Sequence, residues 1–205
     1  MERYCKVCFE KIKFSFLRNM IESKYSICSS CQEKINVDFS SIKVDGVKIK
    51  FLSLYDGLLK NMLLSYKESI DFELRDSILY FFLPYIKLYS LNCIFVPIPS
   101  SKENNSKRGF NHLVEILKVH KLKYVDALEN VSTKNQKELA ANKRMNNKNI
   151  VINKNAYQLQ NKKIILFDDV YTTGSTFISS VNAIKKISPK KIKGLIIMKN
   201  QFQIN

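Results

Sequence analysis

Apolar and polar positions along this chain follow two periods, and each period predicts a different kind of element. From Leu58 to Tyr89, apolar residues recur every three or four positions, with charged residues such as Lys60, Lys67 and Arg75 between them. That spacing places the apolar side chains on one face of a helix. A second amphipathic pattern, from Asn111 to Leu122, predicts another helix.

Short apolar runs rich in branched residues predict buried strands. Asn92–Pro99 is one such run, and Lys163–Asp168 and Ile192–Met198 are two more. Between the last two, Ser175–Ile187 has the pattern of a helix. Strands that alternate with helices predict an α/β fold, in which a parallel sheet carries helices on its faces.

We expect a boundary between Gln32 and Val47, where Asp, Ser and Gly residues interrupt the hydrophobic pattern. The boundary separates a small element, residues 1–40, from a larger domain, residues 41–205. A polar, lysine-rich stretch from Ser132 to Asn149 is expected to be a long loop within that domain.

One apolar segment, Ile78–Val96, approaches the length of a membrane span. Pro84, Lys87 and Asn92 interrupt it, so a core helix followed by a buried strand is the better interpretation. Residues 1–9 contain charges and two cysteines where a secretory signal needs an apolar stretch. The sequence therefore predicts a cytoplasmic protein that does not span a membrane.

Charge narrows the class of partner. The chain has 34 Lys and Arg against 18 Asp and Glu, a formal net charge of +16. Such a surface attracts phosphates, nucleic acid or acidic lipid heads. An ordinary solubilising lysine surface explains the same composition. A hydrophobic content of 45% fits a globular chain and argues against disorder.

Four of the five cysteines form two Cys-x-x-Cys pairs, Cys5 with Cys8 and Cys28 with Cys31. Each pair lets a tight turn direct two thiolates at one cation, and two pairs complete a tetrahedron. The spacing predicts a structural zinc site, on which the folding of so short an element would depend. A redox pair or disulfides are the alternatives, and a cytoplasmic location disfavours both. The fifth, Cys93, is expected to pack in its strand.

The segment Ile164–Thr176 carries the most specific chemistry. Its buried strand ends in two adjacent carboxylates, Asp168 and Asp169, at the edge where parallel sheets bind ligands. Carboxylates can accept hydrogen bonds from the vicinal diol of a ribose. The turn that follows opens a helix, and its amides and hydroxyls are suited to a phosphate; it consists of Thr172, Thr173, Gly174, Ser175 and Thr176. Diol acceptors followed directly by a phosphate cradle predict a site for a 5-phosphoribosyl group, as in phosphoribosyl pyrophosphate.

A simpler interpretation is that these Thr and Ser residues only cap the helix. It leaves the two adjacent aspartates at the strand end unexplained.

With these motifs the chain resembles the type I phosphoribosyltransferases, and more closely the ComF family of competence proteins. The resemblance covers nearly the whole chain, because that family joins a four-cysteine zinc element to a phosphoribosyltransferase-like domain. Val96-Pro-Ile-Pro99 matches the Val-Pro-x-Pro strand end of the family, and Arg108-Gly-Phe-Asn111 matches its Arg-Gly-Phe-Asn motif. The spaced pattern of Gln, Leu, Arg and Asn is matched by Gln136, Leu139, Arg144 and Asn147.

The resemblance implies where pyrophosphate or DNA would be contacted. The family usually has an arginine-rich loop after its Pro-x-Pro, whereas this chain has Ser100–Lys107. Several side chains near the proposed cleft can take over as phosphate contacts; the candidates are Ser100, Lys102, Lys107, Arg108 and Arg144. Magnesium is implied as the ion that accompanies phosphoribosyl pyrophosphate.

The two histidines have different expected roles. His120 lies on the apolar stripe of its helix and is expected to pack in the core. His112 follows the Arg-Gly-Phe-Asn motif, at a position that can face the cleft.

Two functions from different classes remain open. The resemblance implies a competence protein of natural transformation, which handles incoming single-stranded DNA and has other DNA-uptake proteins at the inner face of the membrane as candidate partners. The alternative is an active phosphoribosyltransferase of base or nucleotide salvage. Such an enzyme needs a base pocket, which is not identifiable in the sequence.

Overall fold

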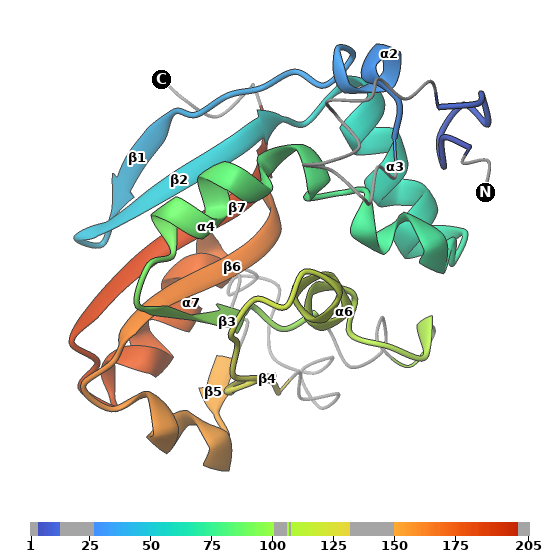
Figure 1. Cartoon of the computed structure of the whole chain (residues 1–205). Coiled ribbons are helices and arrows are strands. Elements are labelled where there is room, and N and C mark those ends of the chain that lie inside the picture. The colour runs from blue at the N-terminus through green and yellow to red at the C-terminus, as the bar shows by residue number, and fades with distance from the viewer. Residues whose placement is uncertain (1–3, 13–26, 101–105, 107, 132–149, 201–205) are drawn as a thin grey trace, which may run out of the picture.

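The computed structural model describes residues 4–12, 27–100, 106, 108–131 and 150–200 of the chain. Within these ranges one sheet is built from β1 (Ser41–Val44), β2 (Val47–Leu54), β3 (Cys93–Pro97), β6 (Lys163–Tyr171) and β7 (Lys191–Lys199). Their spatial order is β1-β2-β7-β6-β3 (Figure 1). A second, two-stranded sheet pairs β4 (Leu128–Asn130) with β5 (Ile150–Ile152).

The large sheet is mostly parallel. β6 pairs in parallel with β3 on one side and with β7 on the other, and β7 pairs in parallel with β2. Only the β1–β2 hairpin at one edge is antiparallel. The predicted α/β class with a parallel sheet is therefore confirmed. The carboxyl ends of β3 and β6 lie side by side, at the edge where α/β sheets bind ligands.

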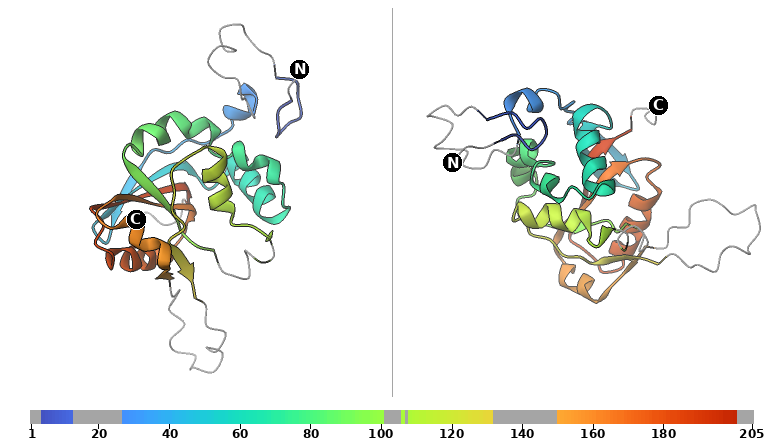
Figure 2. Two further views of the ribbon diagram at one scale, coloured as in Figure 1. Left: turned by 60° about the horizontal axis from the view of Figure 1, so that its bottom comes forward. Right: turned by 90° about the vertical axis from the view of Figure 1, so that its right-hand side faces the viewer.

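Helices cover both faces of this sheet (Figures 1 and 2). The α-helices are α2 (Ser29–Gln32), α3 (Gly57–Glu68), α4 (Leu83–Tyr89), α6 (His112–Val119) and α7 (Ser175–Lys185). Three short 3-10 helices complete the described elements: η1 (Phe72–Asp76), η2 (Tyr80–Phe82) and η4 (Lys154–Leu159). The side chain of Asn111 caps α6 by accepting from the N–H groups of Leu113 and Val114.

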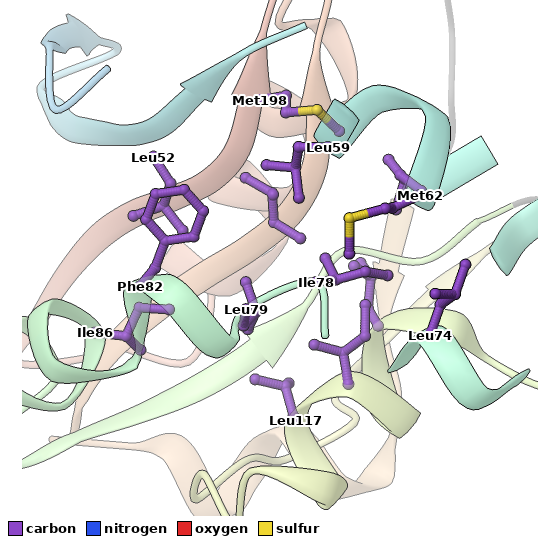
Figure 3. Packing of buried hydrophobic residues seen from close by; sticks show 14 of the residues in the cluster. Leu52, Leu59, Met62, Leu74, Ile78, Leu79, Phe82, Ile86, Leu117 and Met198 are labelled. Carbon is purple, nitrogen blue, oxygen red and sulfur yellow. The ribbon is translucent and has the colours of Figure 1, made fainter. Parts of the chain in front are cut away.

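Alternation along β6 divides the core into two layers. Ile165 and Phe167 point to the face covered by α3, α4 and α6, in a cluster shown in part in Figure 3. Ile164 and Leu166 point to the other face, where they pack with α7 residues such as Phe177. Both faces of the strand are buried, as the run of apolar residues before Asp168 predicts.

The prediction of one continuous helix from Leu58 to Tyr89 is wrong. The chain instead forms α3, η1, η2 and α4 in succession. α3 ends before Ile70, whose φ of 55° lies in the left-handed region and cannot continue a helix. Pro84 lies in the first turn of α4, where its missing N–H costs no helical hydrogen bond.

The apolar segment Ile78–Val96 contains α4 followed by most of β3, as expected for a core helix followed by a strand. Across the described ranges, every helix is too short or too polar to cross a membrane.

The chain joins the sheet before residue 40. The N–H of Asp38 donates to the carbonyl of Leu52, and Val37 bridges Ser53 on β2. The division into residues 1–40 and 41–205 stays a prediction. β1 and β2 themselves lie where the sequence predicted only a boundary and the residues after it.

The first cluster allows a matched test of the fold. Leu79 is fully buried there, whereas Leu88 on α4 is 70% exposed. We expect Leu79→Ala to lower the free energy of unfolding by about 2–5 kcal/mol, since it removes buried methyl groups and leaves a cavity. Leu88→Ala should change it by less than about 0.5 kcal/mol. Urea denaturation of both variants measures the difference, and equal effects would contradict the packing in Figure 3.

Candidate functional site

The four paired cysteines converge on one point. The sulfurs of Cys5 and Cys31 are 3.8 Å apart, those of Cys8 and Cys28 are 3.6 Å apart, and all four lie within 4.8 Å of one another. A zinc ion with bonds of about 2.3 Å to four thiolates requires sulfur–sulfur distances of about 3.8 Å. The cluster therefore fits a tetrahedral metal ion and is compatible with zinc.

Local backbone geometry builds this cluster. The N–H of Phe9 donates to the carbonyl of Cys5, and Phe9 has a φ of 60°, so the first Cys-x-x-Cys closes as a tight turn. The N–H groups of Val7 and Cys28 point at the sulfur of Cys5, at 3.4 and 3.3 Å. Burial raises the pKa of Cys5, but the N–H groups around it outweigh burial and lower the pKa to about 7. These donors favour the thiolate, the form that binds metal.

The segments that carry Cys5, Cys8, Cys28 and Cys31, together called the cysteine element, pack against the main core. Cys5, Ile27 and Cys31 belong to the same buried cluster as residues of α3 and α4. Lys6 adds an ion pair with Asp76 at 2.9 Å. The element therefore packs beside α3, at the end of the molecule away from the β4–β5 pair (Figure 2).

A second candidate site is a cavity of about 370 Å³ at the carboxyl ends of β3 and β6. Its volume is within the range of small-molecule sites. The residues that line it include Lys67, Ser100, Arg108, Asp168, Thr172 and Thr176. The fold thus brings together both predicted diol acceptors, two residues of the predicted cradle and two predicted phosphate contacts, Ser100 and Arg108. The other cradle residues, Thr173, Gly174 and Ser175, are not among those that line the cavity.

The turn after β6 leaves the start of α7 open to an anion. Gly174 is the N-cap, and no side chain caps the helix within the described chain. Its φ of 75° is in the left-handed region, and a Cβ there would collide with the ring of Tyr171, so glycine is required. Thr173 and Ser175 are neighbours, with their hydroxyls 3.1 Å apart. Oγ1 of Thr173 also accepts from the N–H of Ser175 at 3.5 Å, so capping of the helix and phosphate binding both stay open as roles for these residues.

The two adjacent aspartates differ in environment. Asp168 is half-buried, and its Oδ1 accepts from the N–H of Asp169 at 2.9 Å. Asp169 is 7% exposed. Its Oδ2 accepts from Nζ of Lys67 at 2.8 Å and from Nε2 of His112 at 2.5 Å. One oxygen of Asp169 is therefore held by two donors from α3 and α6.

Electrostatics assign the protonation states in this group. Burial acts to raise the pKa of Asp169, but the hydrogen bond from His112 and the charge of Lys67 hold that pKa well below its ordinary value. Burial lowers the pKa of His112 and outweighs the hydrogen bond and charge of Asp169, which act to raise that pKa; the nearby cations Lys67 and Arg108 act in the same direction as burial. A neutral His112 with its proton on Nε2 can donate to Asp169 and accept on Nδ1 from Nη1 of Arg108, which lies 3.4 Å away.

Arg108 is oriented by the end of α3. Its Nε donates to the carbonyl of Lys67 at 3.0 Å. Arg108 is half-buried and forms no ion pair among the described residues, so its charge remains available to an anion. Lys102, Lys107 and Arg144, the other predicted phosphate or DNA contacts, lie outside the described residues.

Sequence reasoning did not single out Lys67 or Asn130, although both line the cavity. Lys67 is 102 residues from its partner Asp169, and no local motif marks it. The position predicted for His112 is compatible with its contact to Asp169. His120 is half-buried, and burial lowers its pKa to about 4, so it is neutral near pH 7.

The mostly parallel α/β sheet and the four-cysteine cluster match the predicted class of protein, a phosphoribosyltransferase-like domain preceded by a small cysteine element. The chain is 28% identical, over 184 residues, to the competence protein ComFC of Streptococcus pneumoniae (strain ATCC BAA-255 / R6). The match covers 89% of this chain and 78% of that protein. The predicted resemblance to competence proteins of the ComF family is thereby confirmed.

Two other comparisons add little. A solved hypoxanthine phosphoribosyltransferase from Staphylococcus aureus matches with a TM-score of 0.36 and 10% identity, over 72% of this chain and 68% of that one. A likeness this slight supports no inference about the site. No family model matches the chain.

The cysteine geometry predicts about one zinc ion per chain, measurable by elemental analysis of protein purified without chelator. We expect Cys28→Ser to lose the metal and to unfold the cysteine element, while the larger domain stays largely intact but loses the contacts of Cys5, Ile27 and Cys31 with its core. Cys93→Ser is the matched control, because Cys93 lies in β3 and outside the cluster. Wild-type protein that contains no zinc would contradict the assignment.

Proposed function

We propose that this chain is a competence protein of natural transformation that handles incoming single-stranded DNA and binds phosphoribosyl pyrophosphate in the cavity beside β6. The observation that supports this ligand is that Asp168, Thr172 and Thr176 line the same cavity. The similarity to ComFC supports the competence role.

In this proposal the two ends of a ribose 5-phosphate occupy adjacent parts of the cavity. The acidic pair at the end of β6 accepts hydrogen bonds from the diol, with Asp168 the more exposed of the two. The 5-phosphate lies against the uncapped start of α7, where backbone N–H groups and the helix dipole stabilise negative charge. Mg²⁺ bound to the pyrophosphate would offset its charge when the ligand is present.

The support for DNA handling is mainly electrostatic. The net charge of +16 favours a polyanion, and Arg108 lies in the cavity without a carboxylate partner among the described residues. Single-stranded DNA is commonly bound by cationic grooves together with aromatic side chains. Exposed aromatic residues such as Tyr157, which is 69% exposed, are available for stacking.

An active salvage phosphoribosyltransferase is the second candidate. The observation in its favour is that four residues of the ribose-phosphate motif, together with Arg108, line a cavity large enough for a small substrate; the four are Asp168, Asp169, Thr172 and Thr176. Catalysis would then be mainly electrostatic, with fixed cations stabilising the departing pyrophosphate.

Binding of phosphoribosyl pyrophosphate with Mg²⁺ should raise the melting temperature. At a ligand concentration of about 100 times Kd the stabilisation is about 2.7 kcal/mol, or about 5–10 °C for a chain of this size. The double change Asp168→Ala, Asp169→Ala should abolish the shift, measured against the melting temperature of the unliganded variant. Asp71→Ala, an exposed carboxylate outside the cavity, is the control and should keep it. A shift that persists in the double variant would exclude the acidic pair as diol acceptors.

Single-stranded DNA should bind with little sequence preference and with strong salt dependence. The slope of log K against log salt should be about −0.7 for each phosphate contacted. Arg108→Glu with Arg144→Glu should weaken binding to all sequences alike, as fluorescence anisotropy would report. Lys34→Glu with Lys154→Glu reverses two exposed charges away from the cavity and is the matched control. Absence of DNA binding, together with release of pyrophosphate from phosphoribosyl pyrophosphate as any free base is consumed, would favour the salvage enzyme instead.

A further inference from the structure

Lys67 lies in the last turn of α3, a helix that packs one face against the core. The buried residues of α3 are Leu59, Met62, Leu63 and Tyr66. The hydroxyl of Tyr66 donates to the carbonyl of His112 at 3.1 Å, which attaches the end of α3 to the start of α6. The next residue, Lys67, lines the cavity beside β6. The packing of α3 therefore places a cation at a site 102 residues away in sequence.

The ion pair of Lys67 with Asp169 is asymmetric. The side chain of Lys67 is 21% exposed, whereas that of Asp169 is 10% exposed. The cation is thus the member of the pair that is more accessible from the cavity. A lysine ammonium has three N–H donors, and the only hydrogen bond of Nζ among the described residues goes to Asp169. The remaining donors can bind a ligand.

Asp169 is poorly placed to act on a ligand through its Oδ2. That oxygen already accepts from Lys67 and His112. A buried carboxylate is costly unless donors surround it, and these two donors supply that compensation. The same contacts fix the position of the Lys67 ammonium, since a long lysine side chain otherwise samples many rotamers.

A second cation, Arg108, lines the same cavity. Arg108 donates to the backbone carbonyl of Lys67 and contacts His112 through Nη1. His112 therefore links Asp169 to Arg108. Across the described chain, Lys67 forms an ion pair only with Asp169, and Arg108 forms none. Two cations, of which only Lys67 has a carboxylate partner among the described residues, favour an anion in the space beside them.

We propose that Lys67 is a ligand-binding residue which, with Arg108, binds a second anionic group of the ligand, and that Asp169 is a positioning residue acting through Lys67. The second group is a phosphate or diphosphate, distinct from the phosphate held at the start of α7. The inference rests on the proposed phosphoribosyl site and deepens it. It assigns different roles to the two aspartates. Asp168 contacts the diol, and Asp169 holds the ammonium group of Lys67 in position.

The test compares three ligands on the intact protein by titration calorimetry: phosphoribosyl pyrophosphate with Mg²⁺, ribose 5-phosphate and inorganic pyrophosphate. Lys67→Met should weaken phosphoribosyl pyrophosphate and pyrophosphate by about tenfold or more, equivalent to about 1.4 kcal/mol. Ribose 5-phosphate should change by less than about twofold, because it lacks the second anionic group. Lys67→Arg keeps the charge and should restore most of the affinity.

Variants of the two aspartates distinguish a residue that positions Lys67 from one that contacts the ligand directly. Asp169→Asn should reproduce the selectivity of Lys67→Met, with loss for the two pyrophosphate ligands and little change for ribose 5-phosphate. Asp168→Asn should weaken both sugar phosphates alike. Melting temperatures without ligand show whether each variant is folded, and Lys67→Gln replaces Lys67→Met if the latter is not.

Three outcomes would overturn the inference. They are an equal effect of Lys67→Met on all ligands, no effect on any, or a loss of ribose 5-phosphate in Asp169→Asn as large as in Asp168→Asn. Failure of the proposed function gives a different result. Wild-type protein that binds pyrophosphate through Lys67 but neither sugar phosphate would uphold the anion subsite and exclude the phosphoribosyl ligand. Binding of none of the three would overturn both.

Discussion

The carboxylate of Asp169 lies at the end of β6, the strand between β3 and β7, and burial removes it from water. A charged carboxylate in that position is stable only if donors reach it, and both donors come from distant parts of the chain. Lys67 arrives from α3 and His112 from α6. Two of the helices that cover this face of the sheet, α3 and α6, are therefore fixed in position relative to the strand that ends in the candidate site. Loss of either donor would leave a buried charge without full compensation, so the core and the cavity cannot be altered independently here.

This constraint also decides the electrostatic character of the cavity. With the charge of Asp169 offset by Lys67, the acidic pair does not act as two equal anions. Asp168 remains half-buried at the cavity wall, and Arg108 contributes a cation without a carboxylate partner among the described residues. The cavity therefore combines a hydrogen-bond acceptor for hydroxyls with donors for anions, close to the uncapped start of α7. A ligand with both hydroxyls and more than one phosphate matches that combination better than a neutral base alone.

The sequence predicted those structural features that depend only on residues close together in the chain. The apolar run before Asp168, the glycine that permits the turn at Gly174 and the spacing of the cysteines each depend on neighbouring residues, and each is found where it was expected. The β1–β2 hairpin was missed even though Val47, Ile49 and Phe51 alternate with lysines, because the polar residues before them suggested a boundary. The break in the long helix at Ile70 was missed because hydrophobic periodicity continues across it. Lys67 could not be recognised, since its role depends on a contact that only the folded chain creates.

α3 connects the two candidate sites. Its buried residues Leu59, Met62 and Leu63 share one cluster with Cys5, Ile27 and Cys31 of the cysteine element. Its last turn carries Lys67 into the cavity beside β6. A short cysteine-rich segment cannot bury enough apolar surface to fold alone, and here it completes the packing around the helix that bears a cavity cation. The core thus runs across the boundary suggested by the sequence at residue 40. The cysteine element is therefore placed to support the position of α3, which offers a physical reason for the two elements to occur in one chain.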